Sequence, residues 1–210
     1  MTLIKNPWNI GGGESRNAGV NQTKDTLPSE FLWIVDGDDH LADNSVLQRI
    51  YDFSQQNPQF DLINLGWNNK GCPAVAGVGY PNGIWARVIR PEIYVQSLKD
   101  NIGCGDDVYP HFVMFDNVDD SRIGTLDYIC YVYPKMGFHI NNTSRKLNNA
   151  KIVGLALMKH RFRKQYVADA LYRAWIMKKI RKEIPDFKVV VESDSQPDGG
   201  IQGCSKTASD

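Results

Sequence analysis

The sequence predicts an α/β fold, and three observations lead to this prediction. Segments with strand-like and helix-like patterns alternate between residues 14 and 133. Residues 31–35 form a continuous apolar run of strand length, which is typical of a strand covered on both faces of an α/β sheet. Hydrophobic residues make up 42% of the 210 positions, a fraction that supports a globular core and excludes a wholly disordered chain.

The amino-terminal elements begin with a loop at residues 6–13, rich in Asn, Pro and Gly, followed by a short helix at residues 14–22. The strand at residues 31–35 comes next, and residues 45–55 have the apolar spacing of an amphipathic helix with Ser45 as its N-cap. Three glycines precede the first helix, so its unpaired N–H groups suit an anion such as a phosphate, although a glycine run is also typical of a plain turn.

The later elements continue the alternation. Aromatic and β-branched residues predict three further strands, at residues 60–67, 85–89 and 125–133. Two helices are predicted between them, one opened by a proline at residues 91–98 and one at residues 106–115. The pattern at residues 149–183 is helical, with an apolar stripe and mainly basic residues elsewhere.

This order divides the chain into three parts: an α/β core at residues 1–147, a basic amphipathic helical region at residues 148–190, and a disordered tail at residues 191–210. The chain has 24 Lys and Arg against 24 Asp and Glu, so a polyanionic partner is expected only for the basic region. Three interpretations of that region remain open: a solvated helix face, contact with anionic lipid, and contact with nucleic acid.

Several protein classes are excluded. No stretch approaches the ~20 apolar residues needed to span a bilayer, and no secretory signal pattern is present, so we expect a cytoplasmic location. The four cysteines are far apart and form no C-x-x-C pair, so neither a zinc site nor a disulfide framework is predicted.

An acidic cluster directly follows the predicted strand at residues 31–35. Asp36 and Asp38 share a face of extended backbone, and Gly37 allows a turn that brings Asp39 close. Such carboxylates repel one another unless a cation neutralises them, and their hard oxygen atoms favour Mg²⁺, Mn²⁺ or Ca²⁺. An acidic surface turn is the alternative. A calcium EF-hand is excluded because Leu47 stands where the loop requires a bidentate Glu.

A second acidic pair, Asp106 and Asp107, precedes the predicted helix at residues 106–115. The two carboxylates could simply stabilise the positive end of the helix dipole. The alternative is a general base, because a carboxylate beside another negative group has its pKa raised toward neutrality.

Several segments, taken in order, resemble motifs of the family 2 glycosyltransferases. The segment NIGGGESRNAG at residues 9–19 is similar to the Asn-x-Gly and Ala-Arg-Asn-x-Gly stretch of that family, and FLWIVDGDD at residues 31–39 resembles its apolar strand followed by a metal-binding D-x-D. Further similar segments are WARVIR at residues 85–90, GDD at 105–107, YVY at 131–133 and NTSR at 142–145. The resemblance covers roughly residues 6–147.

The resemblance implies a GT-A fold, a Rossmann-like mixed sheet with flanking helices, to which the basic carboxyl-terminal helix is added. It implies that Mn²⁺ or Mg²⁺ bridges the diphosphate of a nucleotide sugar, with Asp36, Asp38 and Asp39 at the metal. It implies that Asp107, with Asp106 beside it, removes the proton from an acceptor hydroxyl. The residues expected near the nucleotide sugar are Gly12, Gly13, Arg16, Asn17, Asp36 and Trp85, of which Trp85 would either stack on a sugar ring or pack in the core.

Members of this family usually begin with further strands that form much of the base pocket, whereas this chain starts just before the Asn-x-Gly segment. We therefore expect a core that is incomplete at its amino end, either because the product is truncated or because a partner chain supplies the other half. A missing neighbour would leave apolar sheet surface uncovered.

The resulting hypothesis is an inverting, metal-dependent glycosyltransferase that moves a sugar from a UDP- or GDP-sugar to a hydroxyl of a glycan, a lipid-linked acceptor or a modified nucleic acid. A location at the inner face of the membrane fits the lipid-linked case. The alternative is a non-catalytic or degenerate fragment of the same scaffold that needs a partner chain. A metal-dependent phosphoesterase is less favoured, because only His40 lies near the acidic cluster.

Overall fold

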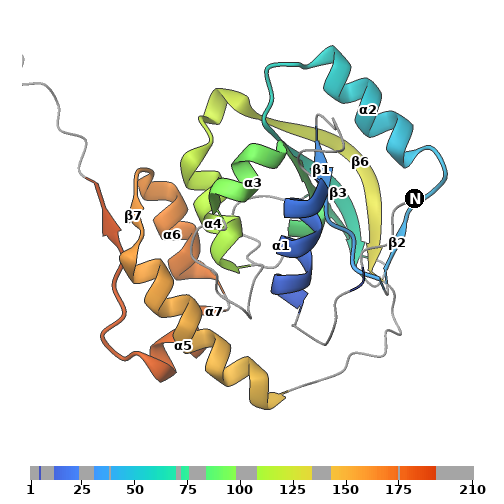
Figure 1. Ribbon diagram of the computed structural model, residues 1–210. Helices are drawn as coiled ribbons and strands as arrows, with labels where there is room; N and C mark the ends of the chain where they lie inside the picture. Colours follow the sequence, from blue (N-terminus) through green and yellow to red (C-terminus); the bar gives the residue numbers. More distant parts are fainter. Residues whose placement is uncertain are drawn as a thin grey trace, which may run out of the picture.

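The computed structural model of this chain describes residues 5, 12–23, 31–37, 39–69, 72–75, 84–97, 108–133, 143–174 and 176–192. They form a mixed sheet with helices on both faces, which confirms the predicted α/β fold (Figure 1). Helix α2 (Val46–Gln56) covers one face. The helices on the other side are α1 (Gly12–Thr23), α3 (Pro91–Ser97) and α4 (Val108–Asn117), and beyond α4 lie α5 (Thr143–Lys159), α6 (Gln165–Arg173) and α7 (Ile176–Glu183).

The sheet combines one parallel strand pair with several antiparallel pairs. Its strands are β1 (Leu32–Trp33), β2 (His40–Leu41), β3 (Leu62–Asn69), β4 (Cys72–Val75), β5 (Arg87–Ile89) and β6 (Ile123–Tyr133). The order is β1-β5-β3-β6-β2, and β4 also pairs with β3. Only β3 and β6 run parallel among the strands of this sheet that the structure describes. Their register shifts at Gly66, where a Cβ atom would collide with the carbonyl oxygen of Tyr128.

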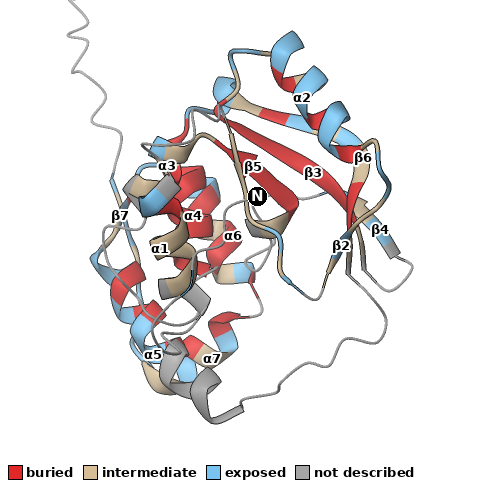
Figure 2. Cartoon of the chain, turned by 45° about the vertical axis from the view of Figure 1, so that its right-hand side comes forward, coloured by how far each residue is buried: buried red, intermediate tan, exposed pale blue. Residues whose placement is uncertain are grey.

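Strand β3 is the buried centre of the described sheet, as the colouring by burial in Figure 2 shows. Its side chains alternate between two cores. Leu62 belongs to the larger core, which the helices α3 to α7 share, whereas Ile63 and Leu65 pack against α2. Because both faces are covered by apolar side chains, the carboxyl end of β3 and the neighbouring end of β6 are held in fixed positions for the site described below.

The strand predicted at residues 31–35 differs from the expectation. Its regular part is only Leu32–Trp33, which pairs with β5 at one end of the described sheet, and Val35 is exposed. Leu32 and Ile34 nevertheless pack against the larger core and Phe31 and Trp33 against the core on the side of α2, so both faces of the segment are covered, although its side chains are only partly buried. The apolar run thus predicts the cover of both faces, but it does not predict that the regular strand is only two residues long.

Local details of the first helices also differ. The expected loop at residues 6–13 ends earlier, because Gly12 is already the first residue of α1. Ser45 occupies the N-cap position of α2, but its hydroxyl donates to Asp43 Oδ1 at 2.7 Å and makes no cap hydrogen bond. Strands β2 and β4, the 3-10 turns η1 (Ile84–Ala86) and η2 (Asp120–Arg122), and the small parallel sheet of β7 (Arg161–Phe162) and β8 (Val190–Val191) were not predicted.

The helical pattern predicted at residues 149–183 is divided into three helices. The first break, between α5 and α6, is fixed by Asp116 at the end of α4. Asp116 is fully buried, and its Oδ1 accepts the backbone N–H groups of Arg163 and Lys164, each at 2.9 Å. The Nε2 atom of His160 lies 2.8 Å from Oδ2 of the same carboxylate. A continuous helix could not offer these N–H groups, because it would use them within its own ladder.

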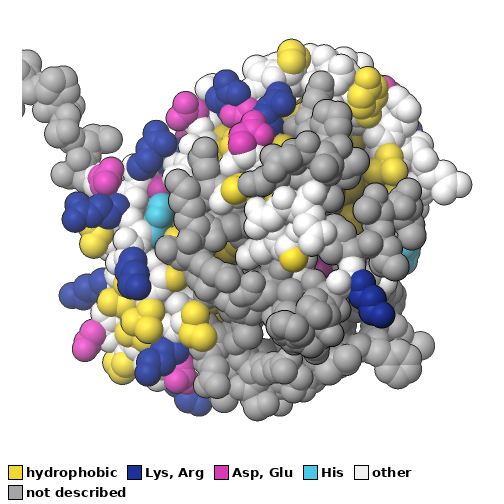
Figure 3. Space-filling view, in the orientation of Figure 1, with side chains coloured by type: hydrophobic (Ala, Val, Ile, Leu, Met, Phe, Trp, Pro, Cys, Tyr) yellow, Lys and Arg dark blue, Asp and Glu magenta, His cyan; other side chains and the backbone are white. Residues whose placement is uncertain are grey.

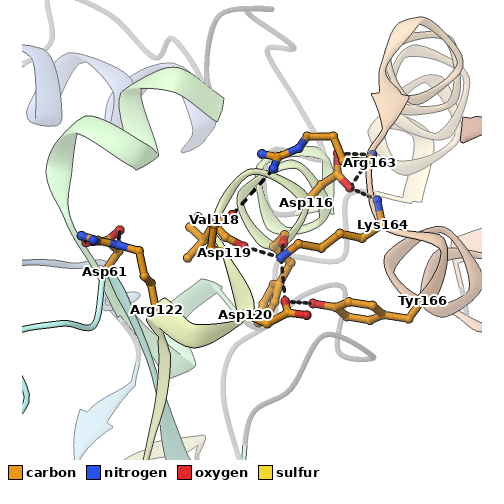
Figure 4. Close-up of polar contacts among 10 residues, drawn as sticks. Asp61, Asp116, Val118, Asp119, Asp120, Arg122, Arg163, Lys164 and Tyr166 are labelled. Atoms are coloured by element: carbon orange, nitrogen blue, oxygen red, sulfur yellow. Dashed lines mark hydrogen bonds and ion pairs between the residues drawn. The ribbon is translucent and has the colours of Figure 1, made fainter. Parts of the chain in front are cut away.

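Lys164 adds a second set of contacts at this junction (Figure 4). Its ammonium group donates to the carbonyl oxygens of Phe115, at 2.9 Å, and Val118, and to Asp120 Oδ1 at 2.7 Å. The Tyr166 hydroxyl donates to the same Asp120 oxygen at 2.6 Å. These bonds attach the carboxyl-terminal helices to the α/β core through the end of α4. Residues 193–210, most of the tail predicted as disordered, lie outside the described residues.

Candidate functional site

The predicted acidic cluster lies in the turn that connects β1 with β2. Asp36 follows β1 and Asp39 precedes β2, and the backbone N–H of Asp39 donates to the carbonyl oxygen of Asp36 at 3.2 Å. Strand β2 pairs with the end of β6, so the turn sits at the edge of the sheet where β6 ends. Asp38, between them, lies outside the described residues.

Asp36 is paired with Arg16 of α1. The Arg16 Nη2 atom donates to Asp36 Oδ1 at 2.7 Å, and the two side chains are 22% and 33% exposed. The pair thus combines a positive and a negative group at a position that solvent still reaches. Asn17 follows Arg16 on α1 and is partly buried, and Gly12 and Gly13 form the amino end of the same helix.

Asp39 is held by a buried tyrosine of β6. The Tyr131 hydroxyl donates a short hydrogen bond to Asp39 Oδ2, and the Tyr131 side chain is fully buried. Burial raises the pKa of Tyr131 well above its ordinary range, and the hydrogen bond to Asp39 and the charge of Asp36 raise it further. Tyr131 therefore stays protonated and acts as a permanent hydrogen-bond donor that orients the Asp39 carboxylate.

An aromatic cluster supports this tyrosine. The Trp85 ring stacks on Tyr131 with centroids 4.6 Å apart and planes at 16°, and it meets Trp67 edge-on at 4.9 Å. The Trp33 indole N–H donates to the carbonyl oxygen of Trp85 at 2.6 Å. Trp85 is partly buried, and these contacts fit the packing role considered for it, in which its ring positions Tyr131. Its stacking on a sugar ring stays a prediction.

Sequence reasoning did not single out Trp33, Trp67 or Tyr131 as site residues. The signal for Tyr131 was present in the Tyr-x-Tyr segment at the end of β6. The signal for the two tryptophans was only their aromatic character within predicted strands, because the ring contacts join residues up to 98 positions apart, Trp33 with Tyr131 among them.

Arg87 is a further residue that the sequence analysis passed over. It is 1% exposed on β5, opposite Asn64 of β3, with its guanidinium 5.0 Å from the centroid of the Phe115 ring of α4. Burial lowers the pKa of Arg87 to about 9, so the group is still charged at neutral pH. Burying a charged group costs free energy because the group loses its hydration. Arg87 belongs to the WARVIR segment and contacts α4, the helix that follows Asp106 and Asp107 in the sequence. That acidic pair itself lies outside the described residues.

The side chains of the turn between β1 and β2 are of the type that binds hard divalent cations. Asp36 and Asp39 offer carboxylate oxygens, which Mg²⁺ and Mn²⁺ prefer. Arg16 already neutralises Asp36, so the negative charge that a cation would compensate lies at Asp39 and at Asp38. Among the described residues, which omit Asp38, no group of three or more His, Cys, Asp or Glu could hold a metal ion.

The described helices include none long and apolar enough to cross a membrane. Neither the protein-family models nor the curated proteins searched include a match to the sequence.

Solved structures that are similar to this chain include two of the same protein. TarS of S. aureus, residues 1–349, matches with a TM-score of 0.55 and 15% identity, over 84% of this chain and 53% of that chain. The same protein in complex with UDP matches with a TM-score of 0.51 and 16% identity, over 78% and 51%. This chain thus spans about half the length of the structures it matches. At such identity the likeness concerns the fold: the chain has a mixed α/β fold that resembles the GT-A fold of TarS.

Proposed function

We propose that this chain carries the donor-binding and catalytic residues of an inverting, metal-dependent glycosyltransferase, which transfers a sugar from a UDP- or GDP-sugar to a hydroxyl acceptor. The observation that carries the proposal is the pairing of Arg16 with Asp36 beside the Asp39 carboxylate, in one turn at the edge of a GT-A-like sheet. The similarity to a structure that contains UDP supports a nucleotide as the ligand.

In this proposal the two carboxylates have different roles. Arg16 can turn its guanidinium from Asp36 to a phosphate or the base, while Asp36 accepts hydrogen bonds from the nucleotide. Asp39, oriented by Tyr131, would hold Mn²⁺ or Mg²⁺ together with Asp38. When bound, the metal neutralises the charge that develops on the departing diphosphate. Gly12, Gly13 and Asn17 at the start of α1 would contact the nucleotide through backbone and amide groups.

The acceptor half of the reaction is assigned to the acidic pair before α4. Asp107 would take the proton from an acceptor hydroxyl while that oxygen attacks the anomeric carbon from the face opposite the diphosphate, which inverts the configuration. Asp106 contributes the neighbouring negative charge that keeps the base effective near neutral pH.

The first test is calorimetric titration of the purified chain with UDP and GDP, in the presence and absence of Mn²⁺. Asp39→Asn should weaken the metal-dependent binding at least about tenfold, because a carboxylate ligand becomes a neutral amide. The matched control is Asp43→Asn, since Asp43 also accepts a hydroxyl hydrogen bond from a tyrosine of β6, Tyr128 at 2.5 Å. Equal nucleotide binding by the wild type and Asp39→Asn would exclude the metal role of Asp39.

The second test separates catalysis from binding. Asp107→Asn should retain nucleotide binding and lose sugar transfer to any acceptor that the wild type uses. Transfer at the wild-type rate would refute the assignment of the base. Nucleotide binding by a wild type that transfers none of a panel of UDP- and GDP-sugars would favour the alternative, a non-catalytic binding fragment.

A further inference from the structure

Helix α5 presents an unusual outer surface. The exposed side chains among its described residues are Lys151, Ile152, Leu155, Met158 and Lys159, which we call the α5 face. With 3.6 residues per turn they lie on one side of the helix, opposite the buried Val153, Gly154, Ala156 and Leu157. The α5 face contains no acidic residue.

The apolar members of the α5 face are exposed to a degree that packing within the chain does not explain. Ile152 is 45% exposed, Leu155 46% and Met158 36%. Figure 3 shows hydrophobic side chains gathered over α5 with Lys and Arg side chains beside them. A single exposed leucine is ordinary, whereas three adjacent exposed apolar side chains on one helix are typical of a surface that contacts a protein or a membrane.

The neighbouring helix α7 adds positive charge. Its exposed side chains are Lys178, Arg181 and Lys182. Helices α5 and α7 pack closely, because a Cβ atom at Gly154 would come within 2.8 Å of Ile180 Cγ2 and 2.9 Å of Ile184 Cδ1. Among described residues 150–192 the exposed acids are Asp186 and Glu192, far fewer than the exposed Lys and Arg.

We infer that the α5 face docks on the surface of an anionic lipid bilayer, with its three apolar side chains inserted at the level of the headgroups. Lys151 and Lys159 flank the apolar side chains and can extend their ammonium groups to lipid phosphates. Lys178, Arg181 and Lys182 add the longer-range attraction to a negative surface. This inference does not depend on sugar transfer, since it concerns residues of the carboxyl-terminal helices alone.

Two other occupants fit the surface less well. A second copy of the chain in a symmetric contact would bring the lysines of both copies together, and like charges repel. A nucleic acid would be attracted by the Lys and Arg residues, but it would leave the apolar side chains without a partner.

The experiment is sedimentation of the full chain with vesicles of phosphatidylcholine alone and with vesicles of equimolar phosphatidylcholine and phosphatidylglycerol. The chain should sediment with the anionic vesicles only, and binding should weaken when NaCl is raised from about 0.1 M to about 0.5 M, because salt screens the attraction. Sedimentation with neither kind of vesicle would overturn the inference.

Variants distinguish the two contributions. Lys151→Gln with Lys159→Gln should weaken binding to the anionic vesicles about 30-fold, from the usual contribution of a basic residue near such a surface. Leu155→Ser should weaken it about tenfold by removing buried methylene groups. Circular dichroism should show unchanged folding, since all these positions are exposed.

The matched control is Leu47→Ser, because Leu47 is 61% exposed on α2, on the opposite face of the sheet. This variant should bind anionic vesicles as the wild type does. Equal loss in Leu47→Ser and Leu155→Ser would overturn the inference. A wild-type dimer that dissociates when the α5 face is substituted would also overturn it. The same holds if the chain binds a DNA or RNA duplex through Lys151 and Lys159 but does not bind vesicles.

Discussion

Asp116 and Asp36 are both carboxylates next to basic residues, but their surroundings differ in kind. Asp116 is fully buried and accepts the backbone N–H groups of Arg163 and Lys164. Asp36 is one-third exposed and is paired with the side chain of Arg16. Backbone donors cannot leave without breaking the chain's local structure, whereas a guanidinium can turn toward a ligand. The first arrangement joins elements of the fold, and the second leaves a charge available for binding.

The largest effect is expected from Asp116→Ala. The variant would leave two backbone N–H groups, those that donate to this buried carboxylate, without an acceptor and remove the partner of His160. An unsatisfied buried donor costs about 1–3 kcal/mol, so the free energy of unfolding should fall by about 3 kcal/mol or more. Urea unfolding, followed by circular dichroism, measures the loss.

The control for this prediction is Asp119→Ala. Asp119 is a largely exposed neighbour whose contact with Arg163 is 3.6 Å long, and an exposed ion pair of this kind contributes less than about 1 kcal/mol. If the two variants were equally stable, the assignment of Asp116 as the anchor of the carboxyl-terminal helices would be wrong.

A smaller, pH-dependent effect is expected at Asp61, a second fixed carboxylate. Asp61 accepts hydrogen bonds from Arg122, at 2.5 Å to Oδ1, and from Arg90 at 3.0 Å. The Arg122 hydrogen bond holds the pKa of Asp61 below its ordinary value, although desolvation opposes this. Because Arg122 is half exposed, Asp61→Asn should cost about 1–2 kcal/mol at neutral pH.

The sign of the pH dependence follows from the lowered pKa of Asp61. The stabilisation is present above the unfolded pKa of about 3.9 and is lost as the pH falls through the lower folded value. The difference in unfolding free energy between the wild type and Asp61→Asn should therefore be full at pH 7 and shrink below about pH 4. An equal difference at both pH values would show that the charge of Asp61 is not what stabilises the fold.

Tyr131→Phe tests the role of Asp39 without replacing the carboxylate itself. It removes the hydroxyl that donates to Asp39 and keeps the ring that stacks on Trp85. Stability should fall by about 1 kcal/mol, while the affinity for Mn²⁺ with UDP should fall about tenfold, as is usual when the group that orients a metal ligand is lost. Tyr128→Phe, which removes the corresponding hydrogen bond to Asp43, should leave the Mn²⁺-dependent binding of UDP unchanged. A tenfold loss of affinity in Tyr128→Phe would contradict the specific role of Tyr131 in orienting a metal ligand.

The site could be anticipated from the sequence only in part. The turn at Asp36 and Asp39 follows an apolar strand, and this local pattern predicts its position correctly. The contact of Arg16 with Asp36 depends on how α1 packs beside the sheet, and Tyr131 reaches Asp39 through the pairing of β2 with the end of β6. Such non-local pairings leave no periodic signal in one sequence.

The same limit explains the differences in the fold. Residues 31–35 were predicted as one strand, but the regular strand is only Leu32–Trp33. Among the strands that the structure describes, its length is set by pairing with β5, more than fifty positions later. The break between α5 and α6 depends on Asp116 of α4, and nothing within the local sequence around Lys164 indicates that its N–H has a distant acceptor.

The smallest effect on stability, and the sharpest test of the comparison, is expected from Arg16→Gln. The ion pair with Asp36 is partly exposed, so its loss should change the free energy of unfolding by less than about 1 kcal/mol. Nucleotide binding should nevertheless weaken at least about tenfold, because the charge-assisted donor to the phosphates or base is gone. Urea unfolding and UDP titration on the same preparation measure both quantities. A large loss of stability with unchanged UDP affinity would reverse the interpretation and place the Arg16–Asp36 pair with Asp116, among the contacts that hold the fold together.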